Sequence, residues 1–208
     1  MFAPGAGRWI APGVGVAAVL FVVGAVATGP TAIAADGGAV AALVWTGFLL
    51  VFFRDPERTI GAGIVAPADG RVRSVELVGD RWVVSIIMHV SDVHVNRFPL
   101  AATVVRVADG GAGFRPAFRP DAAHNVKRHY ELTTDVGSVE LVQMTGIVAR
   151  RLVSFVGPGD HRDKGDRLGM IVLGSRVDLY LPRDRTEPTV AAGARVKAGE
   201  STIARSRP

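Results

Sequence analysis

Two long apolar runs without charge lie near the start of the chain, Ile10 to Thr28 and Ala39 to Phe53. The first approaches the roughly 20 residues that a helix needs to cross about 30 Å of hydrocarbon, and the second is shorter. Between them, Gly29 to Gly38 is rich in glycine and contains a proline, which is typical of a tight connection. The pattern predicts a membrane-associated helical hairpin over residues 1–53.

Charges beside these runs predict how the hairpin is oriented. Arg8 precedes the first run, Arg54 and Arg58 follow the second, and the connection carries only Asp36. Because basic residues are enriched on the cytoplasmic side, both ends and the domain that follows are expected at the cytoplasmic face of the cell membrane. A cleaved signal peptide is the competing interpretation of the first run, but no small-residue cleavage site is followed by a polar mature start.

After Arg54 the helical period disappears, and short β-branched runs separated by Gly, Pro and Asp follow. We therefore expect a mainly β domain over residues 54–208. The predicted strands are Arg71–Val78, Trp82–Met88, Ala102–Val107, His129–Thr134, Val139–Met144, Leu168–Leu173 and Arg176–Leu181.

A glycine pattern occurs twice in this region, at Gly159–Asp166 and Gly193–Glu200. Each copy has two glycines separated by five residues, an acidic residue next, and a short apolar stretch after it. Such turns are similar to the hammerhead turns of lipoyl- and biotinyl-type β-domains. The repeat favours a compact barrel or sandwich.

Composition narrows the possible chemistry. At 208 residues and 49% hydrophobic content, the chain suits one globular domain plus a membrane segment. The absence of cysteine excludes disulfides, thiolate metal sites and thiol catalysis. The net charge of +5 fits a solvated basic surface or attraction to an anionic lipid surface, and the hydrophobic runs next to Arg54 and Arg58 favour the second. Scattered arginines and only 7% aromatic residues argue against nucleic-acid binding. His89 and His94 show no metal-binding spacing, so neither a metal site nor a metallohydrolase is expected.

The bond between Gly174 and Ser175 joins two predicted strands, where a plain turn is the ordinary interpretation. A serine hydroxyl can also attack the preceding carbonyl when the turn is strained, since glycine leaves that carbonyl open to approach. The ester so formed can eliminate to dehydroalanine, which hydrolyses to ammonia and an N-terminal pyruvoyl group. Strands on both sides would hold the bond in place.

Five segments in order resemble the short form of the phosphatidylserine decarboxylases. They are Phe52–Arg58, Ala66–Gly70, Val93–Pro99, Val142–Arg151 and Gly169–Pro182. The resemblance implies self-cleavage between Gly174 and Ser175, a covalent pyruvoyl cofactor made from Ser175, and decarboxylation of membrane phosphatidylserine to phosphatidylethanolamine. It also implies a heterodimer of chains 1–174 and 175–208, which can assemble further.

The same resemblance implies the catalytic residues Asp69, His94 and Ser175. His94 would act as the base in self-cleavage and as the general acid in decarboxylation, because an ordinary histidine pKa near 6.5 allows both. Long-form enzymes have a second histidine three residues later, where this chain has Arg97. His94 therefore has to combine two roles, or His89 or His129 substitutes.

Arginines suit the phosphodiester of such a lipid, because the guanidinium fork donates two hydrogen bonds to its oxygens. Arg97, Arg150 and Arg151 are the candidates. The main alternative function is a membrane-anchored carrier or binding module of the biotinyl or lipoyl type. That module requires a lysine at a hairpin tip, and the turn at Gly174 and Ser175 has none.

Overall fold

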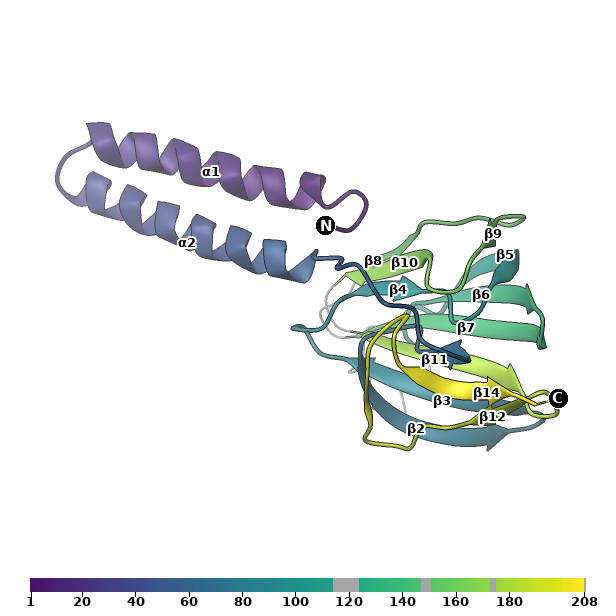
Figure 1. Ribbon diagram of the computed structural model, residues 1–208. Coiled ribbons are helices and arrows are strands. Elements are labelled where there is room, and N and C mark those ends of the chain that lie inside the picture. The colour runs from purple at the N-terminus through teal and green to yellow at the C-terminus, as the bar shows by residue number, and fades with distance from the viewer. Residues whose placement is uncertain (114–123, 147–150, 173–174, 208) are drawn as a thin grey trace. The chain divides into compact units, whose positions relative to one another are not determined.

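The computed structural model of the chain describes residues 1–113, 124–146, 151–172 and 175–207. They divide into two compact units, Met1–Pro56 and Glu57–Pro208. The first unit is helical and the second is built of strands (Figure 1).

The helical unit is a hairpin of α1 (Gly7–Val26) and α2 (Pro30–Phe52). Both helices are long and apolar enough to cross a membrane. The hairpin prediction is confirmed, but the predicted connection over residues 29–38 is wrong, because α2 already begins at Pro30. Proline suits a first helical position, since its fixed φ is helical and no amide partner is needed there. With 23 residues at 1.5 Å each, α2 extends about 35 Å.

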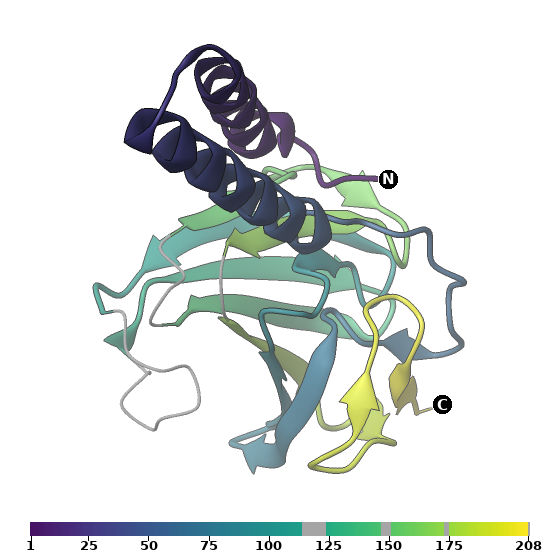
Figure 2. The ribbon, with the colours of Figure 1, turned by 90° about the vertical axis from the view of Figure 1, so that its left-hand side faces the viewer.

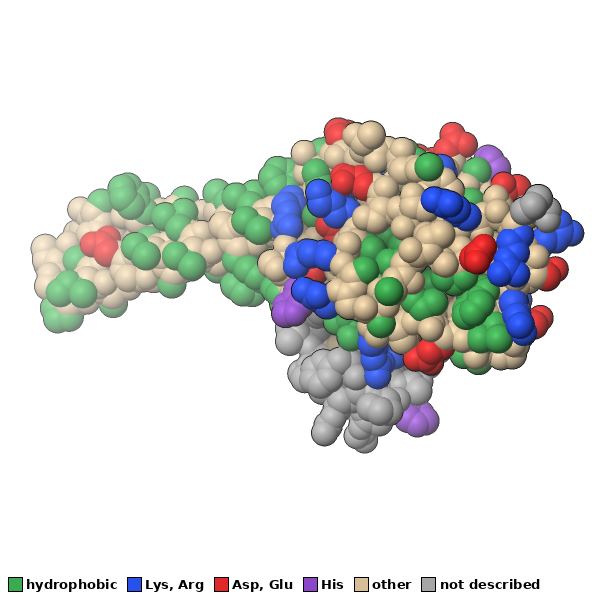
Figure 3. Space-filling view, turned by 60° about the horizontal axis from the view of Figure 1, so that its bottom comes forward, with side chains coloured by type: hydrophobic (Ala, Val, Ile, Leu, Met, Phe, Trp, Pro, Cys, Tyr) green, Lys and Arg blue, Asp and Glu red, His purple; other side chains and the backbone are tan. Residues whose placement is uncertain are grey.

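Glycines let the two helices approach closely. A Cβ atom on Gly13 or Gly24 of α1 would collide with Thr46 or Asp36 of α2, respectively. Asp36 therefore lies against α1 and not in a loop. Large apolar side chains point outward along the hairpin, as the green surface in Figure 3 shows. Close packing through small residues with an apolar exterior is typical of helices in a membrane.

The β unit is dominated by one eight-stranded antiparallel sheet that curves strongly (Figure 1). Its strand order is β13-β2-β3-β11-β7-β6-β5-β9. The strands are β2 (Gly70–Val78), β3 (Arg81–Met88), β5 (Ala102–Gly110), β6 (Lys127–Thr134), β7 (Gly137–Thr145), β9 (His161–Arg162), β11 (Ser175–Pro182) and β13 (Arg195–Val196).

Two small antiparallel sheets complete the unit. One has the order β4-β10-β8, with β4 at Val95–Arg97, β8 at Arg151–Ser154 and β10 at Arg167–Val172. The other has the order β1-β14-β12, with β1 at Ile64–Val65, β12 at Thr186–Pro188 and β14 at Thr202–Ser206. The C-terminal segment, yellow in Figure 2, thus returns to the beginning of the unit.

All seven predicted strands are present, and the predicted mainly β class with a helical hairpin is confirmed. Observed ends differ from the predicted ones by up to three residues, and Leu173 lies outside the described residues. The strands that sequence did not predict are short: β1, β4, β8, β9, β12, β13 and β14. Such short strands show no alternation to recognise, and pairing with distant strands decides them.

The repeated glycine pattern produces the same local structure twice. Gly159, Gly165, Gly193 and Gly199 all have φ between +77° and +90°, a region that favours glycine. Each copy contains a two-residue strand, β9 or β13, and these are the two edges of the large sheet. A Cβ on Gly165 would collide with Ile60, which also lies near Gly199, so the two turns come together around one side chain.

Alternation along β11 places the core. Val177, Leu179 and Leu181 are fully buried, while Arg176 and Tyr180 alternate with them and are half-buried. The inward residues pack with Val84 and other apolar side chains in one continuous core. This core fixes β11 in register between its neighbours, which positions the site described next.

Candidate active site

The backbone of Ser175 begins β11, at the point where the chain passes from one sheet to another. β10 ends at Val172 in the sheet with β4 and β8, and β11 starts in the eight-stranded sheet. Ser175 pairs with Met88 at the end of β3 and with Thr145 at the end of β7. Gly174 lies outside the described residues. The first residue of β11 is therefore held from both sides, immediately after the predicted cleavage point.

Thr145 is itself fixed on the far side of this strand end. Its amide donates to the carbonyl of Val126 over 3.0 Å, and its carbonyl accepts from the Asn125 side chain over 2.7 Å. Thr145 and Asn125 are both fully buried. Ser175 thus pairs with a rigid strand end.

His94 is fully buried just before β4. Its ring Nδ1 lies 2.9 Å from the backbone oxygen of Asp92. A carbonyl only accepts hydrogen bonds, so Nδ1 carries the hydrogen and Nε2 of the neutral ring carries the lone pair. The His94 carbonyl accepts the amide of Ile171, over 3.3 Å, close to the end of β10. The imidazole therefore belongs to the strand pair that leads into Ser175, with Nε2 as its basic atom.

Asp92 organises the loop that carries this histidine. Its Oδ2 accepts the amide of His89 over 2.7 Å, and its Oδ1 accepts from the Arg195 guanidinium over 2.8 Å. Asp92 is buried, whereas the Arg195 side chain is 67% exposed. Sequence reasoning missed Asp92, although an acidic residue two positions before the candidate histidine was a signal.

Buried amides connect β4 to the neighbouring strands. The Asn96 side chain accepts from Gln143 over 2.7 Å and donates to the sulfur of Met88, which pairs with Ser175. Gln143 in turn accepts from the hydroxyl of Tyr130 over 3.1 Å. Burial raises the pKa of Tyr130, so the hydroxyl stays a neutral donor. These fully buried contacts hold β4, with His94 just before it (together called the His94 strand), against β3 and β7, the two strands that pair with Ser175.

Asp69 forms an ionic cluster with Arg58 and Glu200. One nitrogen of Arg58 donates to both carboxylate oxygens of Asp69, at 2.9 and 3.0 Å, and another donates to Glu200 at 3.0 Å. Asp69 also accepts the amide of Ala198 over 2.8 Å. The Arg58 side chain is only 5% exposed. Because Glu200 and Ala198 follow residue 175, this cluster joins segments on both sides of the predicted cleavage point.

Opposite charges in this cluster change the pKa values of Arg58 and Glu200. Burial alone would lower the pKa of Arg58, but Asp69 and Glu200 outweigh burial and raise it. The hydrogen bond from Arg58 lowers the pKa of Glu200. Arg58 was predicted only as a membrane-flanking charge, so the structure gives it a different role within the β unit.

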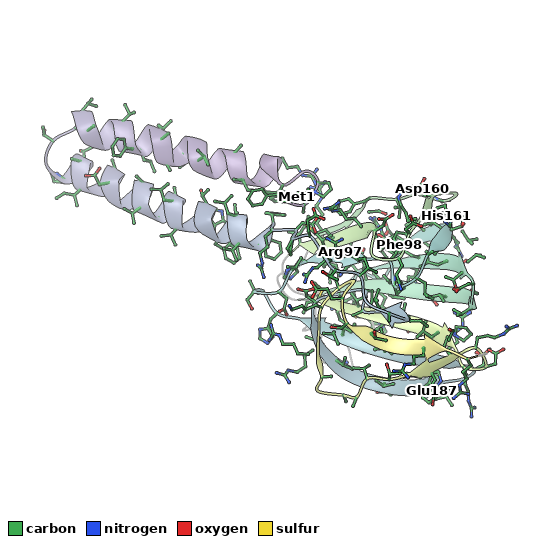
Figure 4. The ribbon with its side chains drawn as sticks, viewed as in Figure 1. Met1, Arg97, Phe98, Asp160, His161 and Glu187 are labelled. Atoms are coloured by element: carbon green, nitrogen blue, oxygen red, sulfur yellow. The ribbon has the colours of Figure 1, made fainter. Side chains whose placement is uncertain are left out.

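The three candidate phosphate ligands differ in their surroundings. Arg97, labelled in Figure 4, is buried and donates to the carbonyl of Gly165 over 2.9 Å. It pairs with Arg167, at the end of β10 away from Ser175. Arg151 is exposed and pairs with Val172, which precedes Ser175 by three residues. Arg150 lies outside the described residues.

A hollow of about 380 Å³ lies beside Arg151. Arg128 also lines it, held by Asp109 through two hydrogen bonds of 2.6 and 2.8 Å. The bond to Asp109 raises the pKa of Arg128, and the same bond lowers the pKa of Asp109. A larger hollow of about 470 Å³ includes His161 and Lys164, but it lies at the opposite end of β5 and contains none of the predicted site residues.

The remaining histidines have other surroundings. His129 forms a 2.6 Å bond with Glu140 on the neighbouring strand, and His89 is exposed in the loop of Asp92. His161 contacts Thr103 at the far end of β5. Within the described ranges, no group of three or more His, Asp or Glu side chains could hold a metal ion. Among the described residues, His94 is the fully buried histidine, and it lies beside the end of β10, whereas His89 directly follows Met88, the partner of Ser175, in an exposed loop.

Comparisons with a family model and with individual relatives indicate the same protein family. Residues 45–204 match the family model described as phosphatidylserine decarboxylase. The chain is 41% identical over 206 residues to a phosphatidylserine decarboxylase proenzyme of Streptomyces coelicolor, covering 98% of this chain and 91% of the relative. It is 45% identical over 181 residues to the proenzyme of Nitratidesulfovibrio vulgaris, with 82% and 83% covered. For the Thermobifida fusca proenzyme, identity is 40% over 156 residues, with 74% and 71% covered.

Replacing the buried guanidinium tests the ionic cluster. Arg58→Gln leaves Asp69 without its charged partner, so the free energy of unfolding is expected to fall by about 3 kcal/mol. Arg106→Gln is the matched control, because the Arg106 and Glu131 side chains are 66% and 46% exposed and surface pairs contribute within about 0.5 kcal/mol. Urea denaturation of the full chain in detergent micelles measures both.

Acid should reduce the effect of Arg58→Gln. The contribution of Glu200 is present above the pKa of the unfolded chain and is lost as pH falls through its lowered pKa in the folded chain. The difference in the free energy of unfolding between Arg58→Gln and the parent chain should therefore become smaller below about pH 4. If Arg58→Gln and Arg106→Gln lower the free energy of unfolding equally at neutral pH, the cluster does not stabilise the fold.

Proposed function

The chain belongs to the phosphatidylserine decarboxylase family, and we propose that it cleaves itself between Gly174 and Ser175 and then converts phosphatidylserine to phosphatidylethanolamine with the pyruvoyl group so formed. One observation carries the proposal. Ser175 begins the central strand β11 where two sheets meet, and buried His94 belongs to the strand pair that leads to the same point.

Self-cleavage starts with His94 as general base. Nε2 takes the hydroxyl proton of Ser175, while the bond from Nδ1 to the Asp92 carbonyl fixes the ring. The serine oxygen attacks the Gly174 carbonyl, and the peptide C–N bond breaks to leave an ester and a free amine on residue 175. Loss of the Cα proton of residue 175 then breaks the ester C–O bond, so that Gly174 departs as a carboxylate. Water replaces the nitrogen, which leaves as ammonia.

The surroundings fit a prosthetic group at the first residue of β11. That residue is held by Met88 on one side and Thr145 on the other, so a planar carbonyl there has a fixed direction. When present, the pyruvoyl carbonyl withdraws electrons from the substrate amine and its α-carbon as carbon dioxide leaves. His94 then returns to that carbon the proton that its Nε2 holds, since an imidazole can act as base in one step and as acid in the next.

Asp69 supports this geometry through the backbone in our proposal. Its turn accepts the Arg97 amide at the Pro67 carbonyl over 2.9 Å, which ties the turn to β4 and so to His94. The carboxylate of Asp69 is held by Arg58 and by the amide of Ala198. Asp69 thus acts as a positioning residue for the histidine strand.

The substrate phosphate is assigned to Arg151 and the hollow beside it. Arg151 is exposed and lies next to Val172, whereas Arg97 already binds the Gly165 carbonyl inside the protein. Arg128 adds a second guanidinium, although Asp109 neutralises it. Acyl chains of the lipid remain in the membrane in this arrangement, with the hairpin as the anchor and the β unit on the cytoplasmic side.

The two chains produced by cleavage would remain assembled. In the segment 175–208, β11 pairs with β3 and β7, β13 pairs with β2, and β14 pairs with β1. Three strands of the small chain are therefore built into sheets of the large chain. The mature protein is a heterodimer held by main-chain hydrogen bonds and a shared core.

Intact-mass measurement under denaturing conditions tests self-cleavage. The parent protein should yield two chains, one ending at Gly174 and one beginning with a residue that lacks the amine of Ser175. Ser175→Ala should remain a single chain without decarboxylase activity, because it has no hydroxyl to attack or convert. A full-length mass from active protein, or activity in Ser175→Ala, would refute the proposal.

Maturation rates test the two supporting residues. His94→Gln should slow cleavage by about 10² to 10⁴-fold, the usual contribution of a general base. Asp69→Asn should slow it by about 10 to 100-fold, since it misplaces the histidine strand and leaves the base intact. Pulse labelling followed by gel electrophoresis gives both rates. His161→Gln is the control at the other end of the sheet; if it slows cleavage as much as His94→Gln does, the assignment is wrong.

Kinetics in mixed micelles test the phosphate ligand. Loss of a charge-assisted bond costs about 1.5–3 kcal/mol, so Arg151→Gln should lower kcat/KM by roughly 10 to 100-fold, chiefly through KM. Maturation should proceed normally in this variant. Arg183→Gln, an exposed arginine at the other end of β11, should match the parent. An unchanged KM for Arg151→Gln would exclude Arg151.

A further inference from the structure

We propose that the edge of the β unit that contains Ser175 docks on anionic lipid headgroups as a second membrane contact, separate from the hairpin. This edge, named here the Ser175 rim, consists of residues at the ends of strands on the Ser175 side: Arg71, His89, Val90, Lys127, Arg151 and Arg195. The inference deepens the proposed function and rests on it, since it names the surface from which that site takes its lipid.

Strand register places these residues at one end of the sheets. Arg71 pairs with Ile87 next to the end of β3, and Arg195 pairs with Arg71. Lys127 pairs with Met144 next to the end of β7, which is one residue from the partner of Ser175. Arg151 opposes Val172. The cations therefore surround the strand end at which the lipid headgroup reacts.

Charge on the Ser175 rim is poorly compensated among the described residues. The carboxylates near it are Asp92, Asp69 and Asp109, and each is already ion-paired, to Arg195, Arg58 and Arg128. Arg71 donates only to the carbonyl of Gly193, and Lys127 and Arg151 have no carboxylate partner in the described part of the chain.

The opposite end of the large sheet has a different charge pattern. Its turns contain Asp80 between β2 and β3, Asp135 between β6 and β7, and Asp184 after β11. Arg183 and Arg185 lie beside Asp184, so acids and bases are mixed there. Cations without a carboxylate partner, namely Arg71, Lys127 and Arg151, thus gather at the Ser175 rim, whereas acids lie beside the bases at the opposite end.

An anionic bilayer is the partner that fits this surface. Val90 is exposed in the loop after β3, and this loop follows Met88, the partner of Ser175. An exposed apolar side chain on a basic rim is suited to the headgroup layer, where anionic lipids attract Lys and Arg over about a Debye length, roughly 8 Å at physiological salt. Docking by this rim would bring Ser175 to the headgroup plane while the acyl chains stay in the bilayer.

The absence of cysteine from the sequence makes a single-probe experiment possible. Val90→Cys labelled with a nitrobenzoxadiazole fluorophore reports on the Ser175 rim, and Val78→Cys is the matched control. Val78 is 55% exposed against 42% for Val90, but it precedes the turn at the opposite end of the sheet. The full chain is placed in nanodiscs of phosphatidylcholine, with or without phosphatidylglycerol, an anionic lipid without a serine headgroup.

With phosphatidylglycerol, the Val90 probe should shift its emission to the blue and resist quenching by dithionite. In phosphatidylcholine alone, and in 1 M salt, where the Debye length is about 3 Å, the probe should be exposed to water, with unshifted emission and full quenching by dithionite. Arg71→Gln with Lys127→Gln should lower the docked-to-undocked ratio by about fivefold for each cation removed. Arg183→Gln with Arg185→Gln should leave it unchanged.

Three results would overturn the docking proposal: equal emission from the Val90 probe in both lipids, an equal shift from the Val78 probe, or concentration-dependent protection in neutral detergent, which would indicate a second copy of the chain. Carbon dioxide release from phosphatidylserine nanodiscs is measured separately. Release with an undocked probe refutes docking and leaves the decarboxylase, whereas a docked probe without release supports docking and refutes the activity.

Discussion

The structure depends on the pairing of β11 with β3 on one side and β7 on the other. This strand follows the crossover from the small sheet directly, so the same main-chain hydrogen bonds that build the core also fix the first residue after the crossover. Because its inward residues are fully buried, a shift in register by one residue would expose them. The position of Ser175 is therefore set by the fold and not by a flexible loop.

A second constraint concerns polar groups that this arrangement buries. Arg58, Asp69 and Glu200 neutralise one another, while Asn96, Gln143 and Tyr130 satisfy one another through hydrogen bonds. Such groups are costly to bury without partners, so each set tolerates few rearrangements. Both sets connect strands that are distant in sequence, and both end near β4 or the turn before β2. The His94 strand is thus held by buried polar contacts that stabilise the fold only when every group has its partner.

Several features were predictable from sequence because their signals are local. Short β-branched and apolar runs bounded by Gly, Pro and Asp revealed the seven longer strands, and long uncharged runs revealed the hairpin. Paired glycines revealed two turns that have the same structure in the fold. The hairpin connection was predicted too long, since Asp36 and the glycines beside it resemble a loop in sequence. In the structure these residues belong to α2, where Asp36 lies against Gly24 of α1 and Gly38 lies against Leu20.

The sequence by itself determined the kinds of element, because periodicity is a property of neighbouring positions, and it predicted Asp69, His94 and Ser175 through the motifs that contain them. Tertiary structure alone decided which groups meet: that Asp92 orients the His94 ring, that Arg58 joins Asp69 to Glu200, and that Arg97 is enclosed while Arg151 is exposed. These contacts join residues brought together by strand pairing over long sequence distances. Long-range pairing depends on burial and register across the whole core, so no local pattern specifies it.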